Sequence, residues 1–87
     1  MITLYYTDTF KKHYQKLSDK EQSQFKEKLE FFKSNPFHPS LRVHKIQGTS
    51  NVFEFSVNMD IRVIWIYQGS DIIALIDIGH HNILRKY

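Results

Sequence analysis

The chain has 87 residues, no cysteine and a formal net charge of +3, from 12 Lys and Arg against 9 Asp and Glu. A chain of this length forms one small domain over residues 1–87, burying only about 60–65% of its unfolded surface. The lack of cysteine excludes disulfides, thiolate nucleophiles and cysteine–zinc sites. The mildly basic balance permits an RNA or an acidic protein partner without requiring either.

No apolar stretch approaches the roughly 20 residues that a membrane-spanning helix needs. The sequence begins directly with the strand-like residues 2–6, with no basic segment and apolar core of the kind that marks a signal peptide. It also contains no glycine-rich phosphate loop and no nucleophile-elbow serine. We therefore expect a cytoplasmic protein that uses no nucleotide cofactor.

The first elements are predicted from the spacing of apolar residues. Residues 2–6 are predicted to form a strand. An amphipathic helix is expected from about Asp8 to Leu17, because Phe10, Tyr14 and Leu17 recur at i, i+4 and i+7.

A second helix is predicted from its start and stop signals. Ser18 and Glu21 have the spacing of a capping box, and the helix ends at Asn35-Pro36, because a residue before proline disfavours the α conformation. Its apolar face comprises Phe25, Leu29 and Phe32. The two helices therefore form a hairpin joined by a tight turn.

The second half of the sequence is typical of an antiparallel meander. Residues 36–51 form a long loop, and apolar runs at 52–57, 61–67 and 72–78 read as three strands before a short tail over 80–87. The order β-α-α-β-β-β predicts an α+β fold. The helical hairpin would pack on one face of a small, mainly antiparallel sheet and leave the opposite face free for a ligand.

The expected register of the strands places several polar residues together at one end of this sheet. If residues 68–71 form a four-residue hairpin loop, Arg62 lies opposite Asp77, with Ser56 on its other side. His80 and His81 then emerge just beyond Arg62. Imidazoles beside a guanidinium indicate chemistry at a phosphate.

Structural explanations compete with this interpretation. Arg62 and Asp77 could form a simple cross-strand ion pair contributing about 0.2–1 kcal/mol, and histidines at strand ends are often only solvated. His13, within a charged helix, reads as a surface residue. Adjacent histidines on an extended chain point in opposite directions, so His80 and His81 do not predict a metal site.

Three motifs resemble the RelE/ParE superfamily of bacterial toxins, especially its RelE, YoeB and YafQ branch of ribosome-dependent mRNA interferases. His44-Lys45-Ile46-Gln47-Gly48 is similar to the family's entry to the meander, and Asp60–Tyr67 to the strand whose arginine, matching Arg62, is catalytic. Gly79-His80-His81 is similar to the family's glycine–x–histidine, which selects His81 over His80. Tyr87 has the spacing of a catalytic tyrosine, whereas Glu54 and Ser56 replace the lysines of RelE.

The resemblance implies a metal-independent endoribonuclease without a cofactor. The ribose 2′-OH would attack the adjacent phosphate, with His44 as general base (Glu54 being a less favoured alternative), Arg62 holding the phosphate and His81 as general acid. The residues expected to bind RNA are Lys45, Arg42 and Arg85 along the backbone and Tyr87 stacked on a base.

The same resemblance implies the partners. They are mRNA in the ribosomal A site and a cognate antitoxin, part of which would wrap the domain and fold as it binds. A ParE-like gyrase inhibitor without nuclease activity, or an inactive homologue, would have the same fold and stays open as an alternative.

Overall fold

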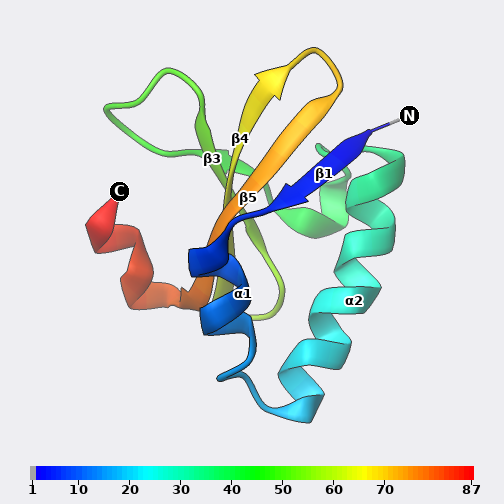
Figure 1. Cartoon of the computed structure of the whole chain (residues 1–87), viewed down its shortest axis with the longest axis vertical. Coiled ribbons are helices and arrows are strands. Elements are labelled where there is room, and N and C mark those ends of the chain that lie inside the picture. Colours follow the sequence, from blue (N-terminus) through cyan, green and yellow to red (C-terminus); the bar gives the residue numbers. More distant parts are fainter. Residues whose placement is uncertain (1) are drawn as a thin grey trace.

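The computed structural model describes residues 2–87 as a five-stranded sheet with two α-helices on one face and a 3₁₀ helix on the other (Figure 1). The strand order is β1-β5-β4-β3-β2, in which β1 is parallel to β5 and every other pair is antiparallel. The predicted α+β, mainly antiparallel fold is therefore confirmed. The elements in chain order are β1 (Thr3–Tyr6), α1 (Asp8–Tyr14), α2 (Asp19–Ser34), η1 (Pro39–Leu41), β2 (His44–Lys45), β3 (Val52–Ser56), β4 (Ile61–Gly69), β5 (Ile72–His80) and η2 (His81–Lys86).

Both helices begin where a side chain caps them. The Thr7 hydroxyl accepts from the Phe10 N–H at the start of α1, and Ser18 forms the predicted reciprocal capping box at the start of α2. The predicted end of the first helix was wrong, because α1 stops at Tyr14. Leu17 is nevertheless buried, since the turn between the helices folds it back onto the core.

The segment expected to be a long loop, residues 36–51, contains two short elements. His38 precedes η1, and its Nδ1 accepts from the Ser40 N–H at 3.1 Å. The two residues of β2 then pair with β3, with His44 opposite Glu54. The prediction missed this edge strand because two residues are too few to show a period of two.

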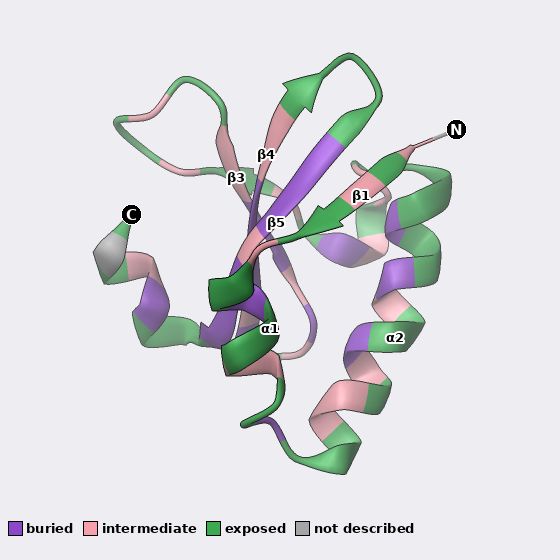
Figure 2. Cartoon of the chain, in the orientation of Figure 1, coloured by how far each residue is buried: buried purple, intermediate pink, exposed green. Residues whose placement is uncertain are grey.

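Aromatic rings fill the core between the sheet and α2. Trp65, Phe32 and Phe55 are fully buried. Figure 2 shows buried segments along α2 and the central strands. The Phe32 ring meets Trp65 edge-on at 5.0 Å and Phe55 at 4.9 Å between centroids. Such pairs contribute about 0.5–1.5 kcal/mol each beyond the area they bury, and they fix α2 against the middle of the sheet.

The opposite face of the sheet is partly covered, which corrects the expectation that it is free. Figure 1 shows η2 and α2 on opposite sides of the strands. Gly79 permits this contact, because a Cβ atom there would lie 2.6 Å from Ile83 Cγ2. Among residues 2–87, no helix is both long and apolar enough to cross a membrane.

Candidate functional site

The β4–β5 register differs from the one predicted. Arg62 lies opposite Gly79, and Asp77 lies opposite Ile64. The chain turns over two residues instead of four, which moves the partner of Arg62 by two positions. Two register irregularities, one between Tyr67 and Gly69 and one between Ile64 and Trp65, offset each other. The predicted pairing of Arg62 with Asp77 was therefore wrong, whereas Ser56 does lie opposite Arg62.

Arg62 is half-buried and held by backbone carbonyls near the β3–β4 turn. Its Nη1 donates to the carbonyl oxygen of Asn58 at 2.7 Å and to that of Ile61 at 3.3 Å. A guanidinium has five N–H donors in a planar fork. The bonds from Nη1 therefore orient the group and leave other donors for a ligand.

Arg62 lines a cleft of about 630 Å³ together with two other cations, Lys28 of α2 and Arg42 at the end of η1. Lys28 Nζ donates to the Ser40 carbonyl at 3.2 Å, and Arg42 adopts the left-handed conformation with φ of +50°. None of the described lining residues is acidic. The remaining lining residues are Pro39, Ser40, Ser56, Val57, Asn58 and Met59. Three unopposed cations favour an anionic ligand.

Sequence reasoning missed Lys28. It lies among alternating charges on a helix, and only the tertiary packing of α2 against η1 brings it into the cleft. The sequence offered no local signal for this residue.

His44 lies in a separate hollow. It and Lys45 line about 230 Å³ of space with Ile46, Gln47, Glu54 and Leu84. His44 and Arg62 share a face of the sheet, two strands and two residues apart. From the strand spacing and residue rise, their backbones are about 12 Å apart.

The histidines at the end of β5 share one carboxylate, that of Asp60. His80 Nδ1 pairs with Asp60 Oδ2, and the His81 backbone N–H donates to Oδ1 at 3.1 Å. The side-chain hydrogen bond raises the pKa of His80 and, with the bond from His81, lowers the pKa of Asp60. The His81 imidazole is exposed and has no hydrogen bond with a described residue. It is free to meet a ligand.

Asp77 is the centre of a buried hydrogen-bond network that was not predicted. Its carboxylate is 1% exposed and accepts from Tyr87 Oη at 2.9 Å and from the Ile78 N–H at 2.8 Å. It also pairs with His13 Nδ1 at 2.6 Å, so the interpretation of His13 as a plain surface residue was wrong. Burial, followed by the bond to Asp77, raises the pKa of Tyr87 to about 12.

This network fixes the C-terminal segment that carries His81. Asp60 holds its first residue, Ile83 packs on Gly79, and Asp77 holds Tyr87 at its end. The Tyr87 hydroxyl thus has a partner, while the residue as a whole is 38% exposed. Arg85 is exposed on the same segment.

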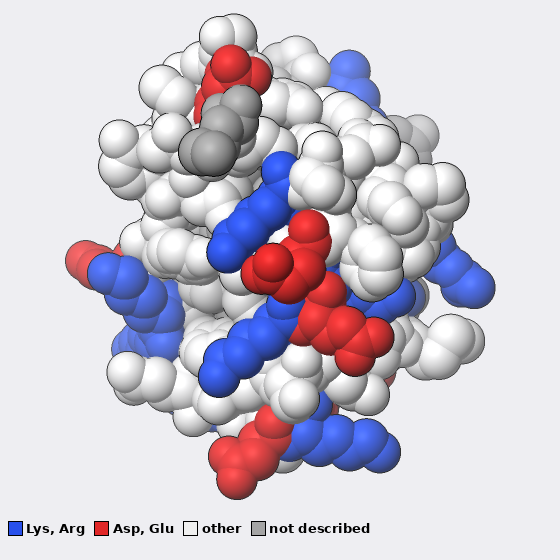
Figure 3. Space-filling view, turned by 90° about the vertical axis from the view of Figure 1, so that its right-hand side faces the viewer, with Lys and Arg blue, Asp and Glu red and all other residues white. Residues whose placement is uncertain are grey.

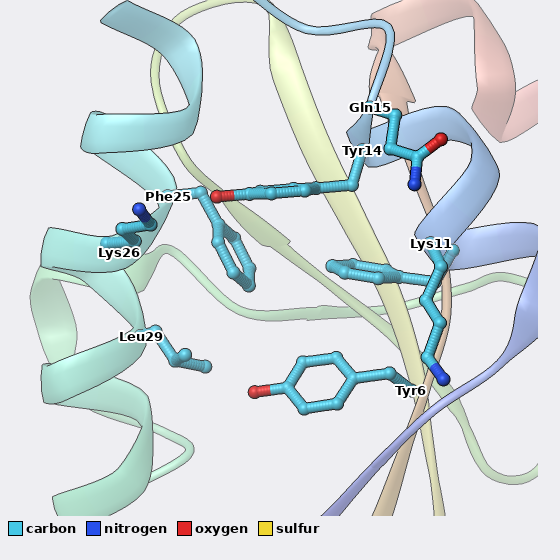
Figure 4. A pocket seen from close by; sticks show the side chains of 8 residues that line it. Tyr6, Lys11, Tyr14, Gln15, Phe25, Lys26 and Leu29 are labelled. Carbon is cyan, nitrogen blue, oxygen red and sulfur yellow. The ribbon is translucent and has the colours of Figure 1, made fainter. Parts of the chain in front are cut away.

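Another hollow, of about 380 Å³, lies between α1 and α2 and is lined mainly by aromatic and aliphatic side chains (Figure 4). Lys11 and Lys26 stand beside it. It includes none of the predicted site residues. On one outer face of the protein, basic and acidic side chains are interspersed, so that face has no patch of a single charge sign (Figure 3).

Solved toxin structures share this fold. A chain of the RelB–RelE antitoxin–toxin complex from Methanococcus jannaschii is 19% identical, with a TM-score of 0.77 over 95% of this chain and 96% of its own. YafQ from E. coli is 18% identical, with a TM-score of 0.74 over 97% and 98%. A YoeB/ParE toxin from Agrobacterium tumefaciens is 15% identical, with a TM-score of 0.78 over 92% and 99%.

These similarities establish a RelE-like fold over 92–97% of the chain. Three of the similar structures are complexes, two of RelE with RelB and one of YafQ with DinJ. No protein-family model matches the sequence, and no curated protein matches it either. The structural likeness at these identities defines the fold and leaves the activity to be argued from the site.

Proposed function

We propose that this protein is the toxin of a type II toxin–antitoxin system, an endoribonuclease that cleaves mRNA in the ribosomal A site without a metal. The observation that carries the proposal is the cleft lined by Arg62, Lys28 and Arg42, whose described lining includes no acidic residue. A phosphodiester is the natural ligand for an oriented guanidinium flanked by two further cations. The RelE-like fold supports the same choice.

The reaction needs no nucleophile from the protein. A base removes the 2′-OH proton, the 2′ oxygen attacks the adjacent phosphorus, and the bond to the leaving 5′ oxygen breaks as an acid protonates it. His44 is our candidate base and His81 our candidate acid. Arg62 would stabilise the charge that builds on the phosphate oxygens, a role that its carbonyl-bound orientation supports.

The spacing of these groups sets a requirement on the substrate. His44 and Arg62 line different hollows on one sheet face, so RNA must bridge them. Catalytic contacts in free enzymes are often long and tighten only in the complex. Lys45, Arg85 and the exposed ring of Tyr87 would guide the strand between the hollows.

The protein partner is inferred from the similar structures that were solved as complexes. An antitoxin segment would wrap the domain and neutralise it, as the complexes of similar toxins with RelB and DinJ support. It would fold as it binds.

The separation of His44 from Arg62 favours one alternative, a ParE-like toxin that acts by binding gyrase and needs no acid or base. Ribosomes programmed with a defined mRNA separate the two functions. We expect cleavage by the wild type and a loss of about 10²–10³-fold in Arg62→Ala. Arg62→Lys should remain poor, because an ammonium loses the fork geometry.

Lys20→Ala is the matched control, since this exposed lysine lies at the start of α2, outside the lining of the cleft. Its cleavage rate should equal that of the wild type. Absence of cleavage by the wild type, together with inhibition of gyrase supercoiling, would overturn the nuclease proposal in favour of the alternative.

A further inference from the structure

A buried carboxylate lacks the partner that such a group requires. Glu54 is 9% exposed, and its Oε2 has no hydrogen-bond partner among the described residues. Buried charges in native proteins are normally paired, so an orphan carboxylate oxygen marks a place where a donor arrives. The reaction proposed above makes no use of it.

The orphan oxygen belongs to a residue that lines a hollow of about 230 Å³. Three elements build that hollow: β3 supplies Glu54, β2 supplies His44 and Lys45, and η2 supplies Leu84. Ile46 contributes a second aliphatic side chain. The hollow therefore combines apolar sides, suited to the faces of a flat ring, with an acceptor and basic groups.

The chemistry of the carboxylate selects among the nucleobases. An ionised carboxylate only accepts hydrogen bonds, through two oxygens, and is best matched by two adjacent N–H donors. Guanine presents such a pair, N1–H and N2–H, on its Watson–Crick edge. Adenine and cytosine place a ring-nitrogen acceptor beside their amino group, and uracil flanks its single N–H with carbonyl oxygens. Those acceptors would repel the second carboxylate oxygen.

We propose that Glu54 reads a guanine base of single-stranded RNA in this hollow. Bases of single-stranded RNA are commonly recognised in this way, by hydrogen bonds to their Watson–Crick edge and by apolar contact with their faces. The inference deepens the proposed function, on which it rests, by naming the base that the site prefers.

The hollow lies close enough to Arg62 for one nucleotide to occupy both sites. Glu54 and Arg62 are on neighbouring strands and share a sheet face, two residues apart along the strands. Strand spacing and residue rise place their backbones about 8 Å apart. Guanine in the hollow would thus set which phosphate reaches Arg62, and Lys45 at the hollow would meet the backbone.

The direct test is a nucleotide titration of the wild-type protein followed by the backbone amide signals in NMR. We expect GMP to shift the signals of His44, Ile46 and Glu54 and to bind at least about tenfold more tightly than AMP, CMP or UMP. Inosine monophosphate, which lacks the N2 amino group, should bind more weakly than GMP. Equal affinity for GMP and inosine monophosphate would overturn the proposal, whatever the nuclease activity.

Glu54→Gln tests the residue itself. The amide replaces one of the two acceptor oxygens with a donor that would face a guanine N–H, so the preference for GMP should disappear while binding through the phosphate remains. Glu27→Gln, on the exposed surface of α2, is the matched control and should keep the preference. If Glu54→Gln fails to fold, the comparison of GMP with inosine monophosphate on the wild-type protein still tests the guanine proposal.

Cleavage on programmed ribosomes separates this inference from the proposed function. A preference for guanine at the cleavage site in the wild type, lost in Glu54→Gln, supports both. Selective GMP binding without cleavage supports the guanine site and counts against the nuclease. If cleavage shows no preference for the base at the cleavage site and GMP does not bind selectively, the nuclease proposal stands and the proposal of a guanine site is overturned.

Discussion

Tyr87→Phe tests whether the Asp77 network holds the C-terminal segment in place. The substitution removes only the hydroxyl that donates to Asp77 Oδ2 at 2.9 Å. The carboxylate is 1% exposed and keeps its contacts with His13 and the Ile78 N–H, both of which involve the other oxygen, Oδ1. The variant therefore leaves a buried carboxylate oxygen without its side-chain donor.

The magnitude follows from the charge and the exposure of this bond. A hydrogen bond to a charged group contributes about 1.5–3 kcal/mol to stability. Because Tyr87 is 38% exposed, water can replace part of the lost bond, and we expect a loss just below this range, about 1–1.5 kcal/mol. For a domain of this size, that corresponds to a decrease in Tm of roughly 4–12 °C.

Urea and thermal unfolding followed by circular dichroism measure this loss. Tyr5→Phe provides the same chemical change at a residue that is 54% exposed, and should alter the free energy of unfolding by less than about 0.5 kcal/mol. Indistinguishable stabilities for the two variants would refute the reasoning about Asp77.

The tyrosine titration gives an independent check. Burial and the hydrogen bond to Asp77 raise the pKa of Tyr87 in the folded state from its usual value of 10.0 to about 12. The folded state therefore retains a proton that the unfolded chain releases. Its contribution to stability is complete below pH 10 and is lost as the pH rises toward 12. This part of the pH dependence should be absent in Tyr87→Phe.

Three further predictions concern the same end of the sheet. In an NMR titration, His80 should have a raised pKa that falls toward the usual histidine value in Asp60→Asn; its stabilising effect is present at acid pH and is lost as the pH rises through that raised pKa. Gly79→Ala should destabilise the fold by about 1–3 kcal/mol in urea, because its Cβ would meet Ile83. His81→Ala should slow single-turnover mRNA cleavage by about 10²–10⁴-fold and His80→Ala far less; equal, minor losses would count against His81 as the acid.

The fold was predictable because local signals agreed with one another. The capping box at Ser18, the apolar period of α2 and the three apolar runs each indicated their element independently. The register of β4 and β5 was not predictable in the same way. A shorter turn moved the partner of Arg62 from Asp77 to Gly79, and two further irregularities in the pairing offset each other; none of these features has a reliable signature in a single sequence.

The candidate site was predictable only in part, for a related reason. Arg62, His44 and His81 were named from motifs in contiguous sequence. The contacts that the prediction missed join residues far apart in the chain: Asp77 meets His13 across 64 positions, and Lys28 enters the Arg62 cleft from a helix. Such contacts are set by how the elements pack, which periodicity does not encode.

The distribution of charge over the protein explains why the net charge alone indicated so little about the ligand. The formal charge of +3 is small, and one outer face mixes both signs (Figure 3). Three cations line the Arg62 cleft, and none of its described lining residues is acidic, while the buried side chain of Glu54 lines a separate hollow. Segregating the cations from Glu54 lets one sheet face attract a phosphate and accept hydrogen bonds from a base. A ligand carrying both groups, a nucleotide, therefore fits this face better than an anion alone.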